Sequence, residues 1–144
     1  MSTVIICRYL GDLQTEARHE GSATHLRTDA PLDNNGKART FSPTDLLATA
    51  LGTCLLTIMG ITARNHGFVL EPCAADVVKT MSTTPPRRVE SLAARVALPR
   101  NLGSHHRRLL MQAALHCPVM NSIAPAIKVT MEFVDRLDDG SADG

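Results

Sequence analysis

Apolar and polar residues alternate in short runs along the first third of the chain. Residues 3–10 are rich in Val, Ile and Tyr, and residues 13–18 alternate small or apolar side chains with Gln, Glu and Arg. With a further run at 23–28, and with glycine-containing turns between the runs, this period of two predicts short β-strands. The stretch 29–40 is crowded with Pro, Asn, Gly and charged residues, and therefore predicts a surface loop.

A long helix is predicted to follow, beginning after Ser42. Ser42 suits the N-cap, Pro43 suits the first helical position, and Asp45 lies where a capping box places its carboxylate. Gly67 after Asn65 and His66 predicts the end of the helix. Such a helix has about 23 residues and a length of roughly 34 Å. The predicted core stripe consists of Leu47, Leu51, Cys54, Leu55, Ile58 and Met59.

This helix is apolar on nearly every side. Residues 46–63 carry no charge, and the length of this uncharged stretch approaches that of a membrane span. Four Thr, two Gly and the nearby charges of Asp45 and Arg64 favour a buried central helix over a membrane-spanning one. Because a small sheet cannot cover so long an apolar helix, we expect a second subunit to cover the rest.

The remainder of the chain predicts further strands. Residues 73–81 and 88–98 predict two strands joined by an irregular loop, and residues 126–135 predict a last strand. The face of that last strand predicted to be apolar carries Val129, Met131 and Phe133. The acidic tail, residues 137–144, is expected to be flexible.

Two helices are predicted before that last strand. Ser104 is expected to cap a helix that extends to about His116. Pro118 interrupts it and begins a short second helix that extends through Ile123.

Composition narrows the class of protein. The chain has 144 residues, 44% hydrophobic content and a net charge of +1, which predicts one globular domain over residues 1–144. The balanced charge argues against nucleic-acid binding, and an aromatic content of 3% argues against base stacking. We expect no secretory leader and no membrane span, a cytoplasmic location, and reduced cysteines.

The cysteines differ in their local sequence. Cys117 stands directly before Pro118, at the N-cap of a predicted helix, where free backbone N–H groups favour a thiolate. Cys54 lies in the apolar helix, and this position is consistent with either of two roles, a small core residue or a nucleophile. Cys7 and Cys73 lie in apolar runs that predict strands, and we interpret both as structural.

Two motifs carry a family resemblance. The run FSPTDLLATALGTC, which ends at Cys54, resembles the central-helix motif of the OsmC-like and organic hydroperoxide resistance (Ohr) proteins. The run HCPV around Cys117 resembles that family's second cysteine motif. The order of the motifs, their separation of 63 residues and the β-rich first third also match. The loop TDAPLDNNGKA and the region around Cys54 are most similar to a little-characterised OsmC-like branch.

The resemblance implies an α+β fold, with antiparallel sheets wrapped around a long central helix in an intertwined homodimer. It also implies an antioxidant activity in the stress response, the thiol-dependent reduction of organic hydroperoxides. In that chemistry the Cys54 thiolate becomes a sulfenic acid, and Cys117 condenses with it to a disulfide. A small thiol or a lipoylated protein then reduces the disulfide.

Such a reaction needs a cation beside Cys54. A thiol with a pKa near ~8.5 is only a few per cent ionised at neutral pH, and the middle of a helix is too far from its dipole ends to help. The resemblance implies that an arginine supplies the charge. Arg18, Arg27 and Arg39 are candidates, and we prefer Arg18.

The carboxylate that would hold this arginine is displaced here. The best-studied peroxidases have a glutamate ten residues before the first cysteine, where this chain has Thr44. Asp45 comes one residue later, and nine residues at 100° each place it opposite Cys54 on the helix. Asp45 is therefore a candidate to orient an arginine, although its capping role explains it as well.

No metal or cofactor is expected. The chain has no Cys-x-x-Cys, His-x-x-x-His or HExxH spacing and no glycine-rich phosphate loop. His116 neighbours Cys117 and is a candidate base, but we interpret it as a surface residue at the end of a helix. Besides the peroxidase, two other functions stay open: a non-enzymatic dimer that binds a small apolar or anionic ligand or senses redox state, and a cysteine-dependent acyl hydrolase.

Overall fold

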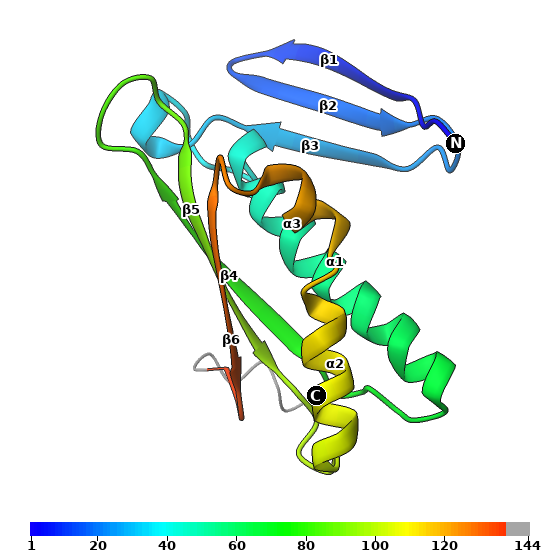
Figure 1. Ribbon diagram of the computed structural model, residues 1–144. Coiled ribbons are helices and arrows are strands. Elements are labelled where there is room, and N and C mark those ends of the chain that lie inside the picture. The colour runs from blue at the N-terminus through cyan, green and yellow to red at the C-terminus, as the bar shows by residue number, and fades with distance from the viewer. Residues whose placement is uncertain (138–144) are drawn as a thin grey trace. The chain divides into compact units, whose positions relative to one another are not determined.

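The structure is a computed structural model that describes residues 1–137 and divides into two compact units (Figure 1). Unit 1 is Met1–Leu47, and unit 2 begins at Ala48. Residues 138–144, most of the tail expected to be flexible, lie outside the described residues, whereas the side chain of Leu137 is buried. The interpretation of residues 1–144 as one domain stays a prediction.

Unit 1 contains an antiparallel sheet with the strand order β1-β2-β3. These strands fall within one or two residues of the runs that predicted them, and the loop that follows contains one short 3₁₀ turn, η1. Their bounds are Ile5–Gly11 for β1, Gln14–His19 for β2, His25–Asp29 for β3 and Leu32–Asn34 for η1. The chain turns from β1 into β2 at Gly11, whose φ of 92° suits a glycine.

Unit 1 has polar residues where a core would be expected. Its fully buried residues are Thr28, Asp29 and Ser42, and each of them hydrogen-bonds through its side chain. Its large apolar side chains are instead exposed: Val4, Ile5, Tyr9, Leu10, Leu13, Leu26, Leu32 and Phe41. A small sheet without its own apolar core requires cover from another surface.

Arg39 ties the loop of unit 1 together. Its Nε lies 2.7 Å from Asp29 Oδ2, its Nη2 lies 3.2 Å from Asp29 Oδ1, and its backbone N–H also donates to Asp29. These hydrogen bonds lower the pKa of Asp29 to about 2. The Nη1 atom lies 3.1 Å from Asp12 Oδ2 as well, so the guanidinium holds a loop in place.

Helix α1 spans Pro43–His66, as the sequence predicts. Its start is a reciprocal capping box: Ser42 N–H donates to Asp45 Oδ2 at 2.8 Å, and Asp45 N–H donates to Ser42 Oγ at 3.1 Å. Gly67 follows the last turn with a φ of 72°. The capping role of Asp45 is therefore confirmed by its geometry.

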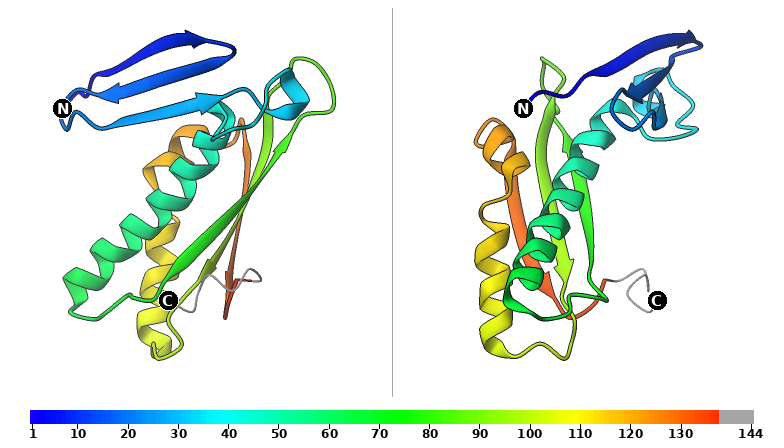
Figure 2. Two further views of the ribbon diagram at one scale, coloured as in Figure 1. Left: turned by 180° about the vertical axis from the view of Figure 1, so that it is seen from behind. Right: turned by 90° about the vertical axis from the view of Figure 1, so that its right-hand side faces the viewer.

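Unit 2 contains a sheet with the strand order β4-β5-β6, and helices α1 and α2 cover the same face of this sheet (Figures 1 and 2). The bounds are Ala74–Met81 for β4, Val89–Ala97 for β5, Ser104–Ala114 for α2, Pro118–Ile123 for α3 and Lys128–Val134 for β6. Strands β4 and β5 are antiparallel as expected, but β6 runs parallel to β5. The helical crossover through α2 and α3 makes that parallel pairing possible.

The start and end of α2 differ from the prediction. The N-cap is Gly103, in an extended conformation and without a side-chain cap, so Ser104 is the first helical residue and not the cap. The helix ends at Ala114 instead of His116, because the chain turns before Cys117. The short helix α3 has the predicted bounds.

The core of unit 2 lies between α1, α2 and the sheet. The face of α1 that it buries consists of Ala48, Leu51, Gly52, Leu55, Met59 and Ala63. Three of the residues in the predicted stripe are thus confirmed, whereas Leu47 is 37% exposed and Cys54 and Ile58 are only partly buried. The buried stripe is rotated because small residues let the helix approach the sheet: a Cβ on Gly52 would lie 3.1 Å from Val77 Cγ2.

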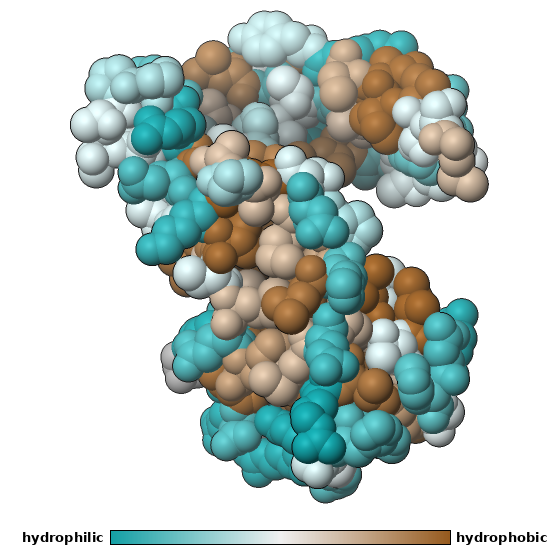
Figure 3. Space-filling model, viewed as in Figure 1, coloured by the Kyte–Doolittle hydropathy of each residue, from teal (hydrophilic) through white to brown (hydrophobic). Residues whose placement is uncertain are grey.

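Helix α1 is long and apolar enough to cross a membrane by length and composition alone, and a third of its most apolar window is buried. Core helices of soluble proteins pass the same test, and the buried stripe of α1 is part of the core of unit 2. Figure 3 shows further apolar residues at the surface on the face that carries α1 and α2. Among the exposed ones are Ile61, Met111 and Leu115.

Candidate functional site

Cys54 lies near the middle of α1, partly buried at the edge of the core of unit 2. It follows Gly52, whose contact with Val77 fixes how closely this turn of the helix approaches β4. The thiol is free. The helix thus presents Cys54 beside the core instead of within it.

Cys117 lies at the junction of α2 and α3, and its side chain is fully buried. It is the N-cap of α3, with Pro118 in the first turn, and its Sγ accepts a hydrogen bond from Met120 N–H at 3.5 Å. The sequence prediction of an N-cap cysteine is confirmed. Because the cap fixes the thiol on the helix terminus, the Cys117 sulfur has a defined direction.

The fold brings Cys54 and Cys117 together from opposite halves of the chain. Burial raises the pKa of Cys117 above its ordinary value, and a hydrogen bond and charge interaction with Cys54 raise it further. The backbone N–H groups of Met120 and Val119 act in the opposite direction. This interaction shows that the side chains of Cys54 and Cys117 lie close to each other.

The three candidate arginines belong to unit 1 and differ in their partners. Arg39 is fully engaged by Asp29 and Asp12. Arg18 Nη1 lies 2.7 Å from Glu20 Oε1, and both side chains are partly exposed, whereas Arg27 is exposed. A carboxylate two residues away therefore pairs with Arg18.

Asp45 serves as the capping carboxylate described above. Its position nine residues before Cys54 puts it on the opposite side of α1. His116 is exposed, and its backbone N–H bonds to Ala113. Cys7 is exposed, and Cys73 is partly buried. Within residues 1–137 no group of His, Cys, Asp and Glu side chains could hold a metal ion.

Comparison with known proteins identifies the family. The family described as OsmC-like protein matches residues 35–132, a range that includes both Cys54 and Cys117. A solved structure from Psychrobacter arcticus 273-4, named for a proposed role in osmotic stress and detoxification responses, is 40% identical. It covers 93% of this chain and 97% of its own, with a TM-score of 0.85. The chain belongs to the OsmC-like family.

More distant OsmC-like structures share the fold. An organic hydroperoxide resistance protein OsmC from Legionella pneumophila is 16% identical over 92% of this chain and 96% of its own, with a TM-score of 0.74. A Vibrio cholerae structure, named as a proposed organic hydroperoxide resistance protein with captopril in one active site, is 18% identical. It covers 95% of this chain and 93% of its own, also with a TM-score of 0.74. No protein with a curated description is detectably similar to the chain.

The family and the geometry agree on what the OsmC-like site can do. Two free thiols that lie close to each other can form a disulfide after one of them is oxidised. The α+β fold expected from the sequence is confirmed by these structural relatives.

Proposed function

We propose that this OsmC-like protein is a thiol-dependent peroxidase that reduces organic hydroperoxides to alcohols. The observation that carries the proposal is the proximity of Cys54 and Cys117, whose side chains interact although the residues lie 63 positions apart in the chain. Family membership supports it, since relatives of the same fold are named for organic hydroperoxide resistance. Cys54 is the proposed nucleophile, and Cys117 is the proposed resolving thiol.

In the first step the Cys54 thiolate attacks the terminal oxygen of the hydroperoxide. The O–O bond breaks, the sulfur is oxidised to sulfenic acid, and the alkoxide takes a proton from solvent to leave as an alcohol. Cys54 suits this role because it lies at the edge of the core, whereas Cys117 is fully buried at the N-cap of α3.

In the second step the Cys117 sulfur attacks the Cys54 sulfenic acid. A disulfide forms, and the sulfenic oxygen leaves as water with the proton that Cys117 gives up. A small dithiol, or the lipoyl group of a protein, then reduces the disulfide and is itself oxidised to a disulfide. No metal or other cofactor is proposed.

Arg18 is the cation that we propose for activation of Cys54. Arg39 is already committed to Asp29 and Asp12, whereas the salt bridge to Glu20 leaves part of the Arg18 guanidinium exposed. We expect Arg18→Gln to slow peroxide reduction at pH 7 about 100-fold, and the loss to shrink at higher pH, where thiols ionise without a neighbouring cation. Arg27→Gln is the matched control.

A homodimer is proposed as the working assembly. The exposed apolar side chains of unit 1 and the exposed Ile61 of α1 leave more apolar surface uncovered than an isolated subunit can tolerate. Analytical ultracentrifugation should give a dimer of this 15.5 kDa chain. A monomer at micromolar concentration would contradict the proposal.

Mass spectrometry after one equivalent of cumene hydroperoxide tests the chemistry directly. We expect a disulfide between Cys54 and Cys117 within one chain, and its absence in the Cys54→Ser variant. The Cys117→Ser variant should accumulate sulfenic or sulfinic acid on Cys54. Unchanged peroxide together with no disulfide would contradict the proposal.

The alternative is a non-enzymatic dimer that binds a small apolar or anionic ligand or senses redox state. Thr44 favours it, because this position holds no carboxylate to orient an arginine. Rapid disulfide formation with slow turnover in the presence of a dithiol would indicate a redox sensor instead of a peroxidase.

A further inference from the structure

A cavity of about 800 Å³ in unit 2 lies outside the thiol pair. Its lining comes from residues 68–69, 71–74, 97–102 and 135–136 and from His106, and includes neither Cys54 nor Cys117. These segments are the connections at the ends of α1, β5 and β6 and the first turn of α2. We call it the Cys73 cavity. Its volume is within the range of small-molecule sites.

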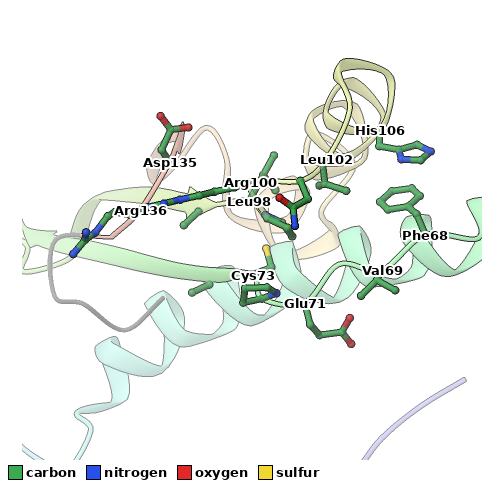
Figure 4. Close-up of a pocket in the computed structure, with 15 residues that line it drawn as sticks. Phe68, Val69, Glu71, Cys73, Leu98, Arg100, Leu102, His106, Asp135 and Arg136 are labelled. Atoms are coloured by element: carbon green, nitrogen blue, oxygen red, sulfur yellow. The ribbon is translucent and has the colours of Figure 1, made fainter. Parts of the chain in front are cut away.

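One end of the Cys73 cavity is aromatic and apolar. The rings of Phe68 and His106 stack with their centroids 4.0 Å apart and an interplanar angle of 10°. Figure 4 shows this ring pair at one end, with Leu102 beside it, and the Cys73 sulfur facing Leu98. These side chains form a wall suited to a flat apolar group.

The other end is cationic. Figure 4 shows the Arg100 side chain extending along the cavity toward the side where Arg136 lies. Neither guanidinium forms a hydrogen bond or an ion pair with any residue in the described range 1–137. Two unpaired guanidinium groups beside an apolar wall are suited to the paired oxygens of a carboxylate.

The acids of the cavity do not neutralise these groups. Glu71 and Asp135 belong to the lining, but in Figure 4 both carboxylates point away from the Cys73 sulfur, on opposite sides of the cavity. Neither one pairs with Arg100 or Arg136. Within residues 1–137, no carboxylate would have to leave either guanidinium for an anion to reach it.

Cys73 adds an apolar floor to the cavity. Burial raises the pKa of its thiol to about 11, so that it is uncharged at neutral pH and does not repel an anion. A thiol in this position also reports occupancy, because a bound ligand would shield it from alkylating reagents.

We propose that the Cys73 cavity binds a small carboxylate with a flat apolar body, the carboxylate on Arg100 and Arg136 and the body against Phe68 and His106. This site is independent of the proposed peroxidase, because it shares no residue with the thiol pair. It would give the protein a second ligand, chemically distinct from a hydroperoxide.

The test uses 2-naphthoate, with the neutral 2-naphthylmethanol and the cationic 2-naphthylmethylamine as probes of the same shape. Isothermal titration calorimetry should give a dissociation constant for 2-naphthoate of about 1 mM or tighter. Each of the other two probes should bind at least about tenfold more weakly, since each lacks the charged hydrogen bonds. Preference for the amine would overturn the proposal.

Variants locate the site. Arg100→Gln combined with Arg136→Gln should weaken 2-naphthoate binding at least about tenfold. Arg108→Gln, an exposed cation on α2 outside the cavity, should leave it unchanged. The Cys54→Ser variant should also bind normally. Loss of binding in Cys54→Ser with retention in the double variant would assign the ligand to the thiol pair and overturn the proposal.

Alkylation of Cys73 gives a readout that does not depend on affinity. Peptide mass spectrometry measures the labelling of each cysteine by N-ethylmaleimide at pH 8.5. Saturating 2-naphthoate should slow the labelling of Cys73 severalfold, while the labelling of exposed Cys7 stays constant. Equal labelling of Cys73 with and without saturating ligand would place the ligand elsewhere and overturn the proposal.

Discussion

Unit 2 contains two buried thiol environments that differ in their neighbours. Burial raises the pKa of both Cys117 and Cys73. Cys117 also lies close to a second thiol, that of Cys54, and its Sγ accepts a hydrogen bond from Met120 N–H at the start of α3. Cys73 has burial alone, in a cavity with cationic and aromatic ends.

Burial by itself therefore does not make a redox site. A buried thiol without a partner is protonated, slow to react and unable to form a disulfide within the chain. A second thiol nearby makes a disulfide possible, and this is the difference between Cys117 and Cys73.

Removing the nucleophile should give the largest effect. Cys54→Ser is expected to lower the rate of cumene hydroperoxide reduction by at least about 10³-fold, because no other thiol has a resolving partner in contact. Cys73→Ala should keep the wild-type rate. The rate of peroxide consumption with excess dithiothreitol measures the activity of both variants. Equal losses of activity would show that Cys54 and Cys73 do not differ in function.

The approach of α1 to the sheet should matter next. In Gly52→Ala the new Cβ meets Val77 at 3.1 Å, whereas in Gly60→Ala it only reaches Leu70 at 4.0 Å. Both substitutions raise the helix propensity by the same amount, so the difference in stability between the two variants measures overpacking alone. We expect Gly52→Ala to have a free energy of unfolding about 1–3 kcal/mol lower than Gly60→Ala. Urea denaturation at one protein concentration measures it. Equal stability of the two variants would show that the helix shifts freely.

The Cys73 thiol should make the protein less stable in alkali. Between the pKa of an unfolded thiol, 9.0, and about 11, the folded state keeps a proton that the unfolded state has lost. The free energy of unfolding therefore falls as pH rises, by at most about 1.4 kcal/mol per pH unit. Urea denaturation at pH 8 and pH 10.5 should show a smaller fall for Cys73→Ala. The same fall in both proteins would contradict burial as the cause.

The helix cap should give the smallest effect. Ser42→Ala removes the acceptor for Asp45 N–H and should cost about 1 kcal/mol of stability. Peroxide reduction should be unchanged, because the capping box lies on a different turn of α1 from Cys54. A selective loss of activity at full stability would instead assign the Asp45 region a role in catalysis.

Local signals made much of the fold predictable. The capping box at Ser42, the glycine after His66 and the N-cap position of Cys117 depend on residues a few positions apart, and the structure has each as predicted. The prediction was wrong for the cap of α2, where the Gly103 backbone takes the place that Ser104 was expected to hold.

The candidate site was less predictable. Its two cysteines could be chosen by resemblance, but the salt bridge from Arg18 to Glu20 had no sequence signal that distinguishes it from an ordinary surface pair. The Cys73 cavity had none either, because its lining comes from four segments that are separate in the chain.

Signals between near neighbours in the sequence predicted the bounds of α1 and α3 and placed the strands to within two residues, because caps, turns and periodicity act over short stretches. Tertiary packing was needed to settle which face of α1 is buried, since that helix is apolar all round and small residues such as Gly52 set its approach to β4. Packing also settled that β6 pairs in parallel with β5, and that Cys54 lies close to Cys117. These outcomes depend on packing between segments far apart in the chain, which no local pattern encodes.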